Sequence, residues 1–214
     1  FQKYALNVET FQILSLLLPE YKILREFAKT GGGDYDSRDI SFELFGMDKL
    51  QAIYVEEGNS TYCSVDGILY TLDKTILVCF PADYPNGELV IEPEVTMVGS
   101  YALENNTKLE KIVIPAGLGD SSYLCYQLNT CSNLSEIEVD ENNPYYIQVK
   151  EKNVLISTPP YYDPDEYTLV LVAKKATSIT IPKEVKRITA TASLHSKNLQ
   201  EIIVEDGNVN FYSE

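Results

Sequence analysis

The chain has 214 residues, of which 44% are hydrophobic and 23% are charged, a composition typical of a folded globular protein. Acidic residues outnumber basic ones by 32 to 17, so the formal net charge is −15, which disfavours binding to nucleic-acid phosphates and to anionic membrane surfaces. No apolar run reaches the roughly 18 residues that a membrane-spanning helix needs, so we expect no insertion into a bilayer.

The N-terminal part of the chain, residues 1–41, has the least regular pattern. Ile13, Leu16 and Leu18, followed by a proline, fit a short strand that recurs later, whereas residues 14–29 also fit a helix. The glycines at 31–33 match neither and predict a turn. We therefore expect a single domain over residues 1–214, with irregular N-terminal repeats or a cap over 1–41 and regular repeats over 42–214.

From residue 42 onwards, a short aliphatic cassette repeats, in which a leucine is followed three and five residues later by another aliphatic residue. The full copies are Leu50/Ile53/Val55, Leu109/Ile112/Ile114, Leu134/Ile137/Val139 and Leu199/Ile202/Val204, and two shorter copies are Leu89/Ile91 and Ile179/Ile181. The last two positions are two residues apart, so both point to the same face of a strand. A strand this short cannot bury that face alone, and a unit of about 24 residues predicts a solenoid of stacked copies.

Two stretches of the repeat match each other without a gap at an offset of 90 residues. The seven aligned pairs are Ile91/Ile181, Val95/Val185, Val98/Ile188, Ala102/Ala192, Leu109/Leu199, Ile112/Ile202 and Ile114/Val204. Chance does not readily match this many positions in register. The agreement predicts that the aliphatic pair after each strand turns back into the same core.

Two insertions interrupt the repeat, and each predicts a β-hairpin. In the first insertion, residues 68–70 are expected to pair with residues 76–80. In the second insertion, residues 154–156 are expected to pair with residues 169–172 across the tyrosine-rich loop 159–165.

Several motifs of the repeat and of the first insertion are typical of one family. They are Val95-x-x-Val98, Leu109-x-x-Ile-x-Ile-Pro, and the insertion sequence of residues 64–70 followed by residues 75–81. On these residues the chain resembles the BspA-like leucine-rich-repeat proteins of bacterial cell surfaces. The resemblance implies a right-handed leucine-rich-repeat solenoid with a parallel concave β-sheet, short strands and turns on the convex side, and β-hairpin inserts. It also implies a secreted or surface-exposed binding module, often one segment of a longer protein, with the signal or anchor outside this chain.

One row of outward-pointing residues on the concave sheet is the first candidate binding surface. It contains the residue between the two strand anchors of each copy: Leu17, Tyr54, Val90, Val113, Glu138, Thr180 and Ile203. Five of these seven are apolar or aromatic, and a contiguous exposed apolar patch usually marks an interaction surface. Two alternatives stay open: β-sheet propensity alone favours such residues, or an insertion folds over the row.

Tyr161 and Tyr162, in the loop of the second insertion, are the second candidate. Tyrosine gives a large contact area at low entropic cost, and loops on a rigid scaffold often carry binding residues, although a plain hairpin tip explains the same residues. The chain has no tryptophan, so stacking against a glycan would use tyrosine. No spacing of cysteine, histidine or carboxylate residues predicts a metal site, and no cofactor motif is present.

The sequence predicts a protein that is not an enzyme. His195 is the only histidine, and the chain has no G-x-S-x-G motif, no H-E-x-x-H motif and no phosphate-binding glycine loop. We expect recognition of a protein or glycan partner through the concave sheet and the inserts, and the alternative is a structural spacer in a longer surface protein. An uncapped C-terminal copy exposes a sheet edge, which predicts self-association through the solenoid ends.

Overall fold

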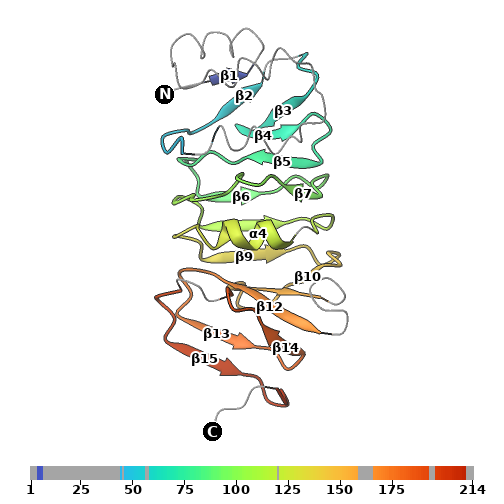
Figure 1. The fold of residues 1–214 in the computed structure, drawn as a ribbon, viewed down its shortest axis with the longest axis vertical. Coiled ribbons are helices and arrows are strands. Elements are labelled where there is room, and N and C mark those ends of the chain that lie inside the picture. Colours follow the sequence, from blue (N-terminus) through green and yellow to red (C-terminus); the bar gives the residue numbers. More distant parts are fainter. Residues whose placement is uncertain are drawn as a thin grey trace.

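The computed structural model describes residues 4–6, 44, 46–55, 58–119, 121–158, 166–192 and 196–210, with the backbone alone for residues 4–6 and 121–123. Figure 1 shows the elements stacked in chain order along the long axis of the molecule, from β1 (Tyr4–Leu6) at one end to β15 (Glu201–Val204) at the other. None of the helices in these residues has the length and the hydrophobicity that a bilayer span requires.

Short parallel strands are the first component of the fold. They are β2 (Ile53–Val55), β6 (Glu88–Val90), β8 (Lys111–Ile114), β9 (Glu136–Val139) and β13 (Ser178–Ile181), together with β1 and β15. β1 pairs with β2, β8 pairs with both β6 and β9, and β13 pairs with β15, always in parallel. Leu89, Ile112 and Ile137 lie opposite one another in this register and are fully buried. Each strand therefore adds one rung to a solenoid, as the repeat predicts.

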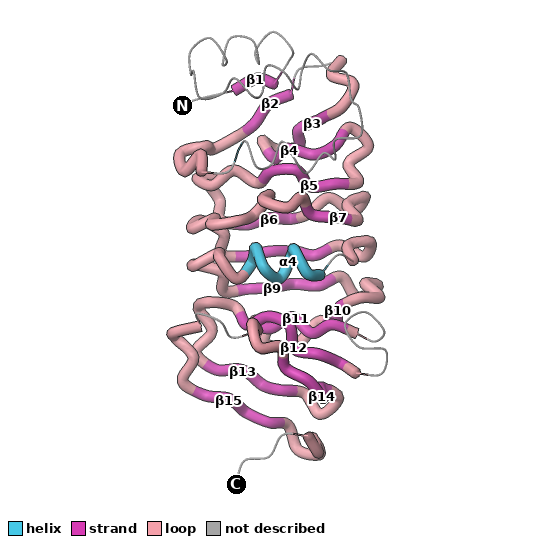
Figure 2. The backbone as a smooth tube through the Cα atoms, in the orientation of Figure 1, coloured by secondary structure: helices cyan, strands magenta, loops and turns pink. Residues whose placement is uncertain are grey.

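A second set of strands comes from the two insertions and from the segment after each of them. One sheet contains β3 (Tyr62–Val65), β4 (Ile68–Thr71), β5 (Ile76–Cys79) and β7 (Met97–Val98), and another contains β10 (Tyr146–Ile147), β11 (Val154–Ser157), β12 (Tyr167–Val172) and β14 (Val185–Ile188). The predicted hairpins β4–β5 and β11–β12 are antiparallel, as expected. Two features were not predicted. β3 and β10 add a strand in front of each hairpin, and β5 and β12 pair in parallel with β7 and β14. The insertions are thus built into the wall of the solenoid (Figure 2).

The turn of each insertion also bonds to one of the parallel strands. The amide of Ile53 in β2 donates to the carbonyl of Gly67 over 2.8 Å, and the amide of Ile137 in β9 donates to the carbonyl of Lys152 over 2.6 Å. Both turns contain a residue with positive φ, Gly67 in the first and Lys152 in the second. Two insertions of different sequence therefore make the same contact with the rung that precedes them.

The hydrophobic core lies between the two sets of strands. The inward residues of β6, β8 and β9 belong to one cluster with Leu77 of β5, Val98 of β7 and Leu171 of β12. Leu124 and Leu128 of the helix α4 (Ser121–Leu128) complete this cluster, and α4 lies in front of β9 in Figure 1. The short returning segments thus turn into the core shared by the rungs, as the aliphatic pattern predicts.

Gln127 of α4 joins the helix to the coil that precedes it. Its side chain is fully buried, and it accepts a hydrogen bond from the amide of Leu103 and donates one to the carbonyl of Gly99, each over 2.8 Å. A buried amide with both ends bonded avoids the cost of an unsatisfied polar group, so the contact fixes the spacing of two adjacent coils.

The structure confirms the solenoid of stacked parallel rungs. The offset of 90 residues holds for most of the aligned pairs, but Ile188 and Ile202 are 38% and 57% exposed where Val98 and Ile112 are buried. The amide of Phe80 donates to the carbonyl of Ala102, and the amide of Val172 donates to the carbonyl of Ala192. Ala192 lies 90 positions after Ala102 and so makes the equivalent hydrogen bond. β1 is a rung that the aliphatic cassette did not predict, because Tyr4 stands at the position that Ile53 has in β2, where the cassette requires an aliphatic residue. The strand expected at Ile13, Leu16 and Leu18, and the alternative helix over 14–29, lie outside the described residues.

Candidate functional site

Three of the predicted surface residues lie side by side on the outer face of β6, β8 and β9. The register places Val90 beside Val113 and Val113 beside Glu138. The side chain of Val90 is 57% exposed, and those of Val113 and Glu138 are half-buried. We call these three residues the central row.

The predicted members of this surface on the remaining rungs lie apart from the central row. Tyr54 is on β2 and is 43% exposed, and Thr180 and Ile203 face each other in the separate sheet β13–β15. The insertion turns account for the separation, because the carbonyls of Gly67 and Lys152 bond to amides of β2 and β9. The single contiguous row that the sequence predicts is therefore divided into patches by turns of the insertions.

Three predicted residues cannot be placed. Leu17, Tyr161 and Tyr162 lie outside the described residues, and so does His195. The loop with the two tyrosines joins β11 to β12, whose last described pair is Ser157 with Thr168.

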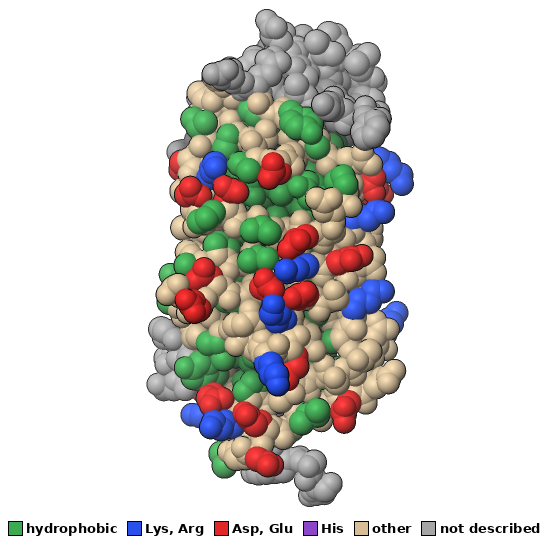
Figure 3. Space-filling model, turned by 180° about the vertical axis from the view of Figure 1, so that it is seen from behind, with side chains coloured by type: hydrophobic (Ala, Val, Ile, Leu, Met, Phe, Trp, Pro, Cys, Tyr) green, Lys and Arg blue, Asp and Glu red, His purple; other side chains and the backbone are tan. Residues whose placement is uncertain are grey.

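A ladder of alternating charges runs across the same strands. Lys111 Nζ lies 3.1 Å from Glu88 Oε1 and 3.4 Å from Glu138 Oε1, so it bridges β6 and β9. Lys152, from the second insertion, pairs with Glu138 and also lies 3.3 Å from Glu136 Oε1. Figure 3 shows the molecule from the side opposite to that of Figure 1. Acidic and basic side chains alternate down the middle of this face, with hydrophobic side chains beside them. We call these five residues the charge ladder.

The pKa shifts of Glu138, Lys111 and Lys152 favour the ionised forms of these side chains. The hydrogen bond from Lys152, followed by the charge of Lys111, holds the pKa of Glu138 below its usual value. The hydrogen bond to Glu88 raises the pKa of Lys111, and that to Glu138 raises the pKa of Lys152. Because these side chains are partly exposed, water screens the pairs, and each contributes little to stability. The ladder fixes the positions of charges rather than the fold.

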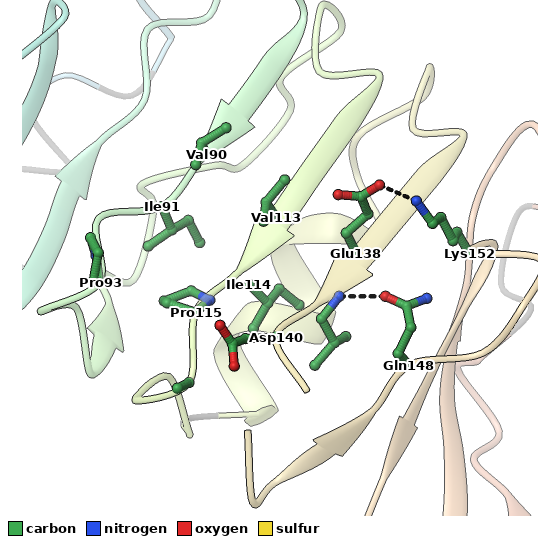
Figure 4. A pocket seen from close by; sticks show the side chains of 12 residues that line it. Val90, Ile91, Pro93, Val113, Ile114, Pro115, Glu138, Asp140, Gln148 and Lys152 are labelled. Atoms are coloured by element: carbon green, nitrogen blue, oxygen red, sulfur yellow. Dashed lines mark hydrogen bonds and ion pairs between the residues drawn. The ribbon is translucent and has the colours of Figure 1, made fainter. Parts of the chain in front are cut away.

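An open groove of about 470 Å³ lies along the C-terminal ends of β6, β8 and β9 (Figure 4). Aliphatic and proline side chains line one part of it, and polar side chains the other. The aliphatic part contains Val90, Ile91, Pro93, Val113, Ile114, Pro115, Ala116 and Val139, and the polar part contains Glu138, Asp140, Gln148 and Lys152. Gln148 Oε1 accepts a hydrogen bond from the amide of Val139 over 2.6 Å, so this side chain covers backbone that β9 leaves unpaired. The groove has no aromatic lining residue.

Sequence reasoning missed the residues that the insertion brings to this site. Glu88, Lys111 and Glu136 occupy one register position, so their alternating charges were available as a signal in the repeat. Lys152 and Gln148 had no such signal, because the second insertion lacks the sequence of the first. Only the folded turn shows that these two side chains reach β9.

The described residues contain no group of three or more histidine, cysteine, aspartate or glutamate side chains that could hold a metal ion. Every chemical group in the groove is a carboxylate, an amide, an ammonium or an aliphatic side chain. This set suits recognition by shape, charge and hydrogen bonding.

Comparisons with solved structures find a vaccine antigen and two leucine-rich-repeat proteins. The pneumococcal vaccine antigen PcpA is 21% identical over 75% of this chain and 34% of its own, with a TM-score of 0.46. A leucine-rich repeat protein from Eubacterium ventriosum is 20% identical over 73% of this chain and 43% of its own, also with a TM-score of 0.46. A leucine rich cell surface protein from Faecalibacterium prausnitzii is 14% identical over 73% of this chain and 42% of its own, with a TM-score of 0.44. The solenoid assignment itself rests on the strand registers described above.

Sequence comparisons cover much less of the chain. A curated protein of Pasteurella multocida (strain Pm70), alpha-2-macroglobulin, is 50% identical over 44 residues, which are 21% of this chain and 2% of that protein. No protein-family model matches the chain. The chain thus spans less than half of each solved structure and a very small part of this curated relative.

Proposed function

We propose that this chain is a non-catalytic binding module of a secreted or cell-surface protein, which recognises its partner through the central row and the adjoining groove. The observation that carries the proposal is the 57% exposure of Val90 at the edge of a groove lined by both aliphatic and charged side chains. An isolated exposed valine is ordinary on a protein surface, but an aliphatic surface that continues into a concave site is typical of binding sites.

The lining of the groove favours a protein partner over a glycan. Glycan recognition in a chain without tryptophan would use tyrosine rings, and the groove has none. The carboxylates of Glu136, Glu138 and Asp140 outnumber the ammonium groups of Lys111 and Lys152 around this surface. The matching partner surface would present aliphatic side chains flanked by lysine or arginine. Tyr161 and Tyr162 remain candidates for a second contact, and for glycan binding.

An array of extracellular-matrix proteins and glycans, probed with the full chain, tests this proposal. We expect binding to protein spots, and we expect the double variant Val90→Ser, Val113→Ser to lose at least about tenfold in affinity, because it removes the aliphatic contact. Its thermal midpoint should stay nearly unchanged, since both side chains face outward. Leu72→Ser is the matched control: Leu72 is 52% exposed in the turn between β4 and β5, so its substitution should leave binding intact.

The alternative function is that of a structural spacer, and one observation favours it. The charges of the ladder are paired with one another, so much of this face is already satisfied within the chain. A spacer predicts that no protein or glycan spot binds the chain. That outcome, or equal binding by the double variant, would overturn the binding site proposed here.

A further inference from the structure

One charged side chain of the groove has no basic partner within the described part of the chain. The groove has three charged lining residues, Glu138, Asp140 and Lys152, and two of them, Glu138 and Lys152, pair with each other. Asp140, in the turn after β9, takes part in none of the ion pairs among the described residues. The charge ladder therefore leaves the carboxylate of Asp140 available to a ligand.

The turn holds Asp140 through one carboxylate oxygen. Its Oδ1 accepts hydrogen bonds from the backbone amide and from Nδ2 of Asn142, over 2.8 and 3.1 Å. The backbone amide of Asp140 donates to the carbonyl of Ile114 over 2.9 Å, which keeps the residue in register with β8. Oδ2 has no hydrogen-bond partner among the described residues. Asp140 thus has a fixed position and one oxygen that can accept from a ligand.

Asp140 lies close to the aliphatic part of the groove. Val113 is beside Glu138 in the register, and Asp140 follows Glu138 by two residues. One strand spacing of about 4.8 Å and two residues of about 3.3 Å each place the Cα atoms of Val113 and Asp140 roughly 8 Å apart. In Figure 4 the side chain of Asp140 points towards Pro115. A ligand can therefore contact aliphatic side chains and this carboxylate at the same time.

The edge of β9 determines how a partner chain can bind here. The amides of Ile137 and Val139 already donate to the carbonyl of Lys152 and to Oε1 of Gln148. A partner strand cannot pair with these amides, so the contact must use the side chains of the partner. A helix, about 10 Å across with its side chains, would fill the groove of 470 Å³ with roughly one turn. The groove therefore suits an extended segment better than a helix.

We propose that the partner contacts the groove with an extended peptide segment in which one residue separates an aliphatic side chain from an arginine or lysine. The aliphatic side chain lies against Val90 and Val113, and the cation binds Asp140. Side chains two residues apart in an extended chain point the same way and are about 6.6 Å apart, which is close to the spacing of the two subsites. This inference rests on the proposed function, because it names the part of the partner that the groove recognises.

The charge of Asp140 gives the segment its specificity. A guanidinium or ammonium group on the partner completes an ion pair that the chain itself leaves open, whereas a carboxylate at the same position is repelled. Lys152 does not take over this role, because its ammonium is held by Glu136 and Glu138. The aliphatic contact alone would accept many sequences, so the preference for a cation depends on Asp140.

An array of short synthetic peptides, probed with the full chain, tests the inference. Each peptide has one leucine and one arginine, in either order, separated by zero to three glycine or serine residues, and matched sets replace the arginine with lysine, glutamine or glutamate. With one intervening residue, we expect arginine and lysine peptides to bind at least about fivefold more tightly than glutamine peptides, and glutamate peptides to bind least. The other spacings have the same charge, so they measure general attraction to this acidic chain.

Two variants and one control assign the preference to Asp140. Asp140→Asn keeps the Oδ1 acceptor for Asn142, and it should reduce the binding of arginine peptides to that of glutamine peptides. Asp140→Lys should reverse the preference, so that glutamate peptides bind best. Glu141→Lys is the matched control: Glu141 is exposed, lies outside the groove lining and gives the same change in net charge, so its variant should still prefer arginine. Thermal midpoints show whether each variant is folded.

Failure of this inference differs from failure of the proposed function. Suppose that a protein spot binds the chain and that the double variant of Val90 and Val113 loses this binding. If arginine and glutamine peptides then bind equally, or if Asp140→Lys and Glu141→Lys behave alike, this inference is wrong and the binding site stands. If neither proteins nor peptides bind, the proposed function is overturned, and this inference with it.

Discussion

At the scale of single residues, buried asparagine side chains hold the turns that follow the rungs. Asn143 is 7% exposed, and its Nδ2 donates to the carbonyls of Pro115 and Leu118 over 2.7 and 3.0 Å. Its Oδ1 accepts from the amides of Tyr145 and Tyr146 over 2.8 and 3.0 Å. One side chain thus satisfies four backbone groups of two adjacent coils.

The last described turn has the same hydrogen bonds from a buried asparagine to two backbone carbonyls of the preceding coil. Asn208 follows its strand anchor by four residues, as Asn143 does, and its Nδ2 donates to the carbonyls of Pro182 and Val185. The asparagine is therefore a structural feature of the repeat, in addition to the aliphatic cassette.

We expect Asn143→Ala to lower the free energy of unfolding by roughly 2–4 kcal/mol, because each buried backbone group left without a partner costs about 1–3 kcal/mol and water relieves part of the loss. Urea unfolding at equilibrium measures this change. Asn142→Ala is the control, since Asn142 is exposed and its side chain bonds to Asp140 in the same turn. A change of less than about 0.5 kcal/mol in the Asn143 variant would contradict the role given to this side chain.

At the scale of the elements, the turn between β3 and β4 depends on close backbone contact with β2. Gly67 has φ +85°, and a Cβ on it would lie 2.7 Å from the Cβ of Ala52. The glycine is needed both for its conformation and for the space beside it. Gly58 has a similar φ of +89°, but a Cβ on it would have no atom within 4 Å. A substitution at Gly58 therefore measures the cost of backbone strain without steric overlap.

We expect Gly67→Ala to lower the free energy of unfolding by about 2–5 kcal/mol, because backbone strain and steric overlap add. Gly58→Ala should cost about 1 kcal/mol, since only its backbone is strained. Adding Ala52→Gly to Gly67→Ala removes the overlapping methyl group and should recover part of the difference. Equal losses in the Gly67 and Gly58 variants, measured by urea unfolding, would show that the turn does not pack against β2 in this way.

At the scale of the whole molecule, the solenoid leaves an apolar surface at β15. Ile202 is 57% exposed, whereas the equivalent residues Leu89, Ile112, Ile137 and Ile179 are between 0 and 4% exposed. Leu89, Ile112 and Ile179 are followed by another rung, and Ile137 is followed by the turn of the second insertion. β15, in contrast, pairs with β13 alone among the described strands. Residues 183–206 carry four basic and four acidic side chains, so this region is neutral in a chain with a net charge of −15. Electrostatic repulsion therefore opposes contact between two copies less here than elsewhere.

Self-association through this end remains a prediction, and light scattering over a range of concentrations tests it. We expect the mass to rise with concentration, and we expect Ile202→Lys to keep the chain monomeric, because a charge at the sheet edge blocks pairing. Val209→Lys is the control, since Val209 is 72% exposed and lies beyond the end of β15. A monomeric mass for the unsubstituted chain at every concentration would contradict this prediction.

Much of the fold was predictable, because the spacing of aliphatic residues in the repeat indicates which side chains face the core. Ile112 and Ile137 are buried where the cassette placed them, and the strands of both hairpins pair as expected. The candidate site was only partly predictable. Val90, Val113 and Glu138 lie together, but Tyr54 and Ile203 belong to separate sheets. The pattern could not show that an insertion turn takes the edge of β9 where the next rung was expected.

The sequence by itself determined the rungs from β2 onwards, most of the residues that face inward, and the partners within each hairpin. These features follow from spacings of two to about 24 residues, over which the chain has only one way to place its apolar side chains. The tertiary structure alone decided that Lys152 reaches Glu138, 14 residues away, and that Lys174 reaches Asn129, 45 residues away. Such contacts depend on the path of the insertions and on the stacking of the coils. The spacing of polar residues along the sequence does not indicate either of these features.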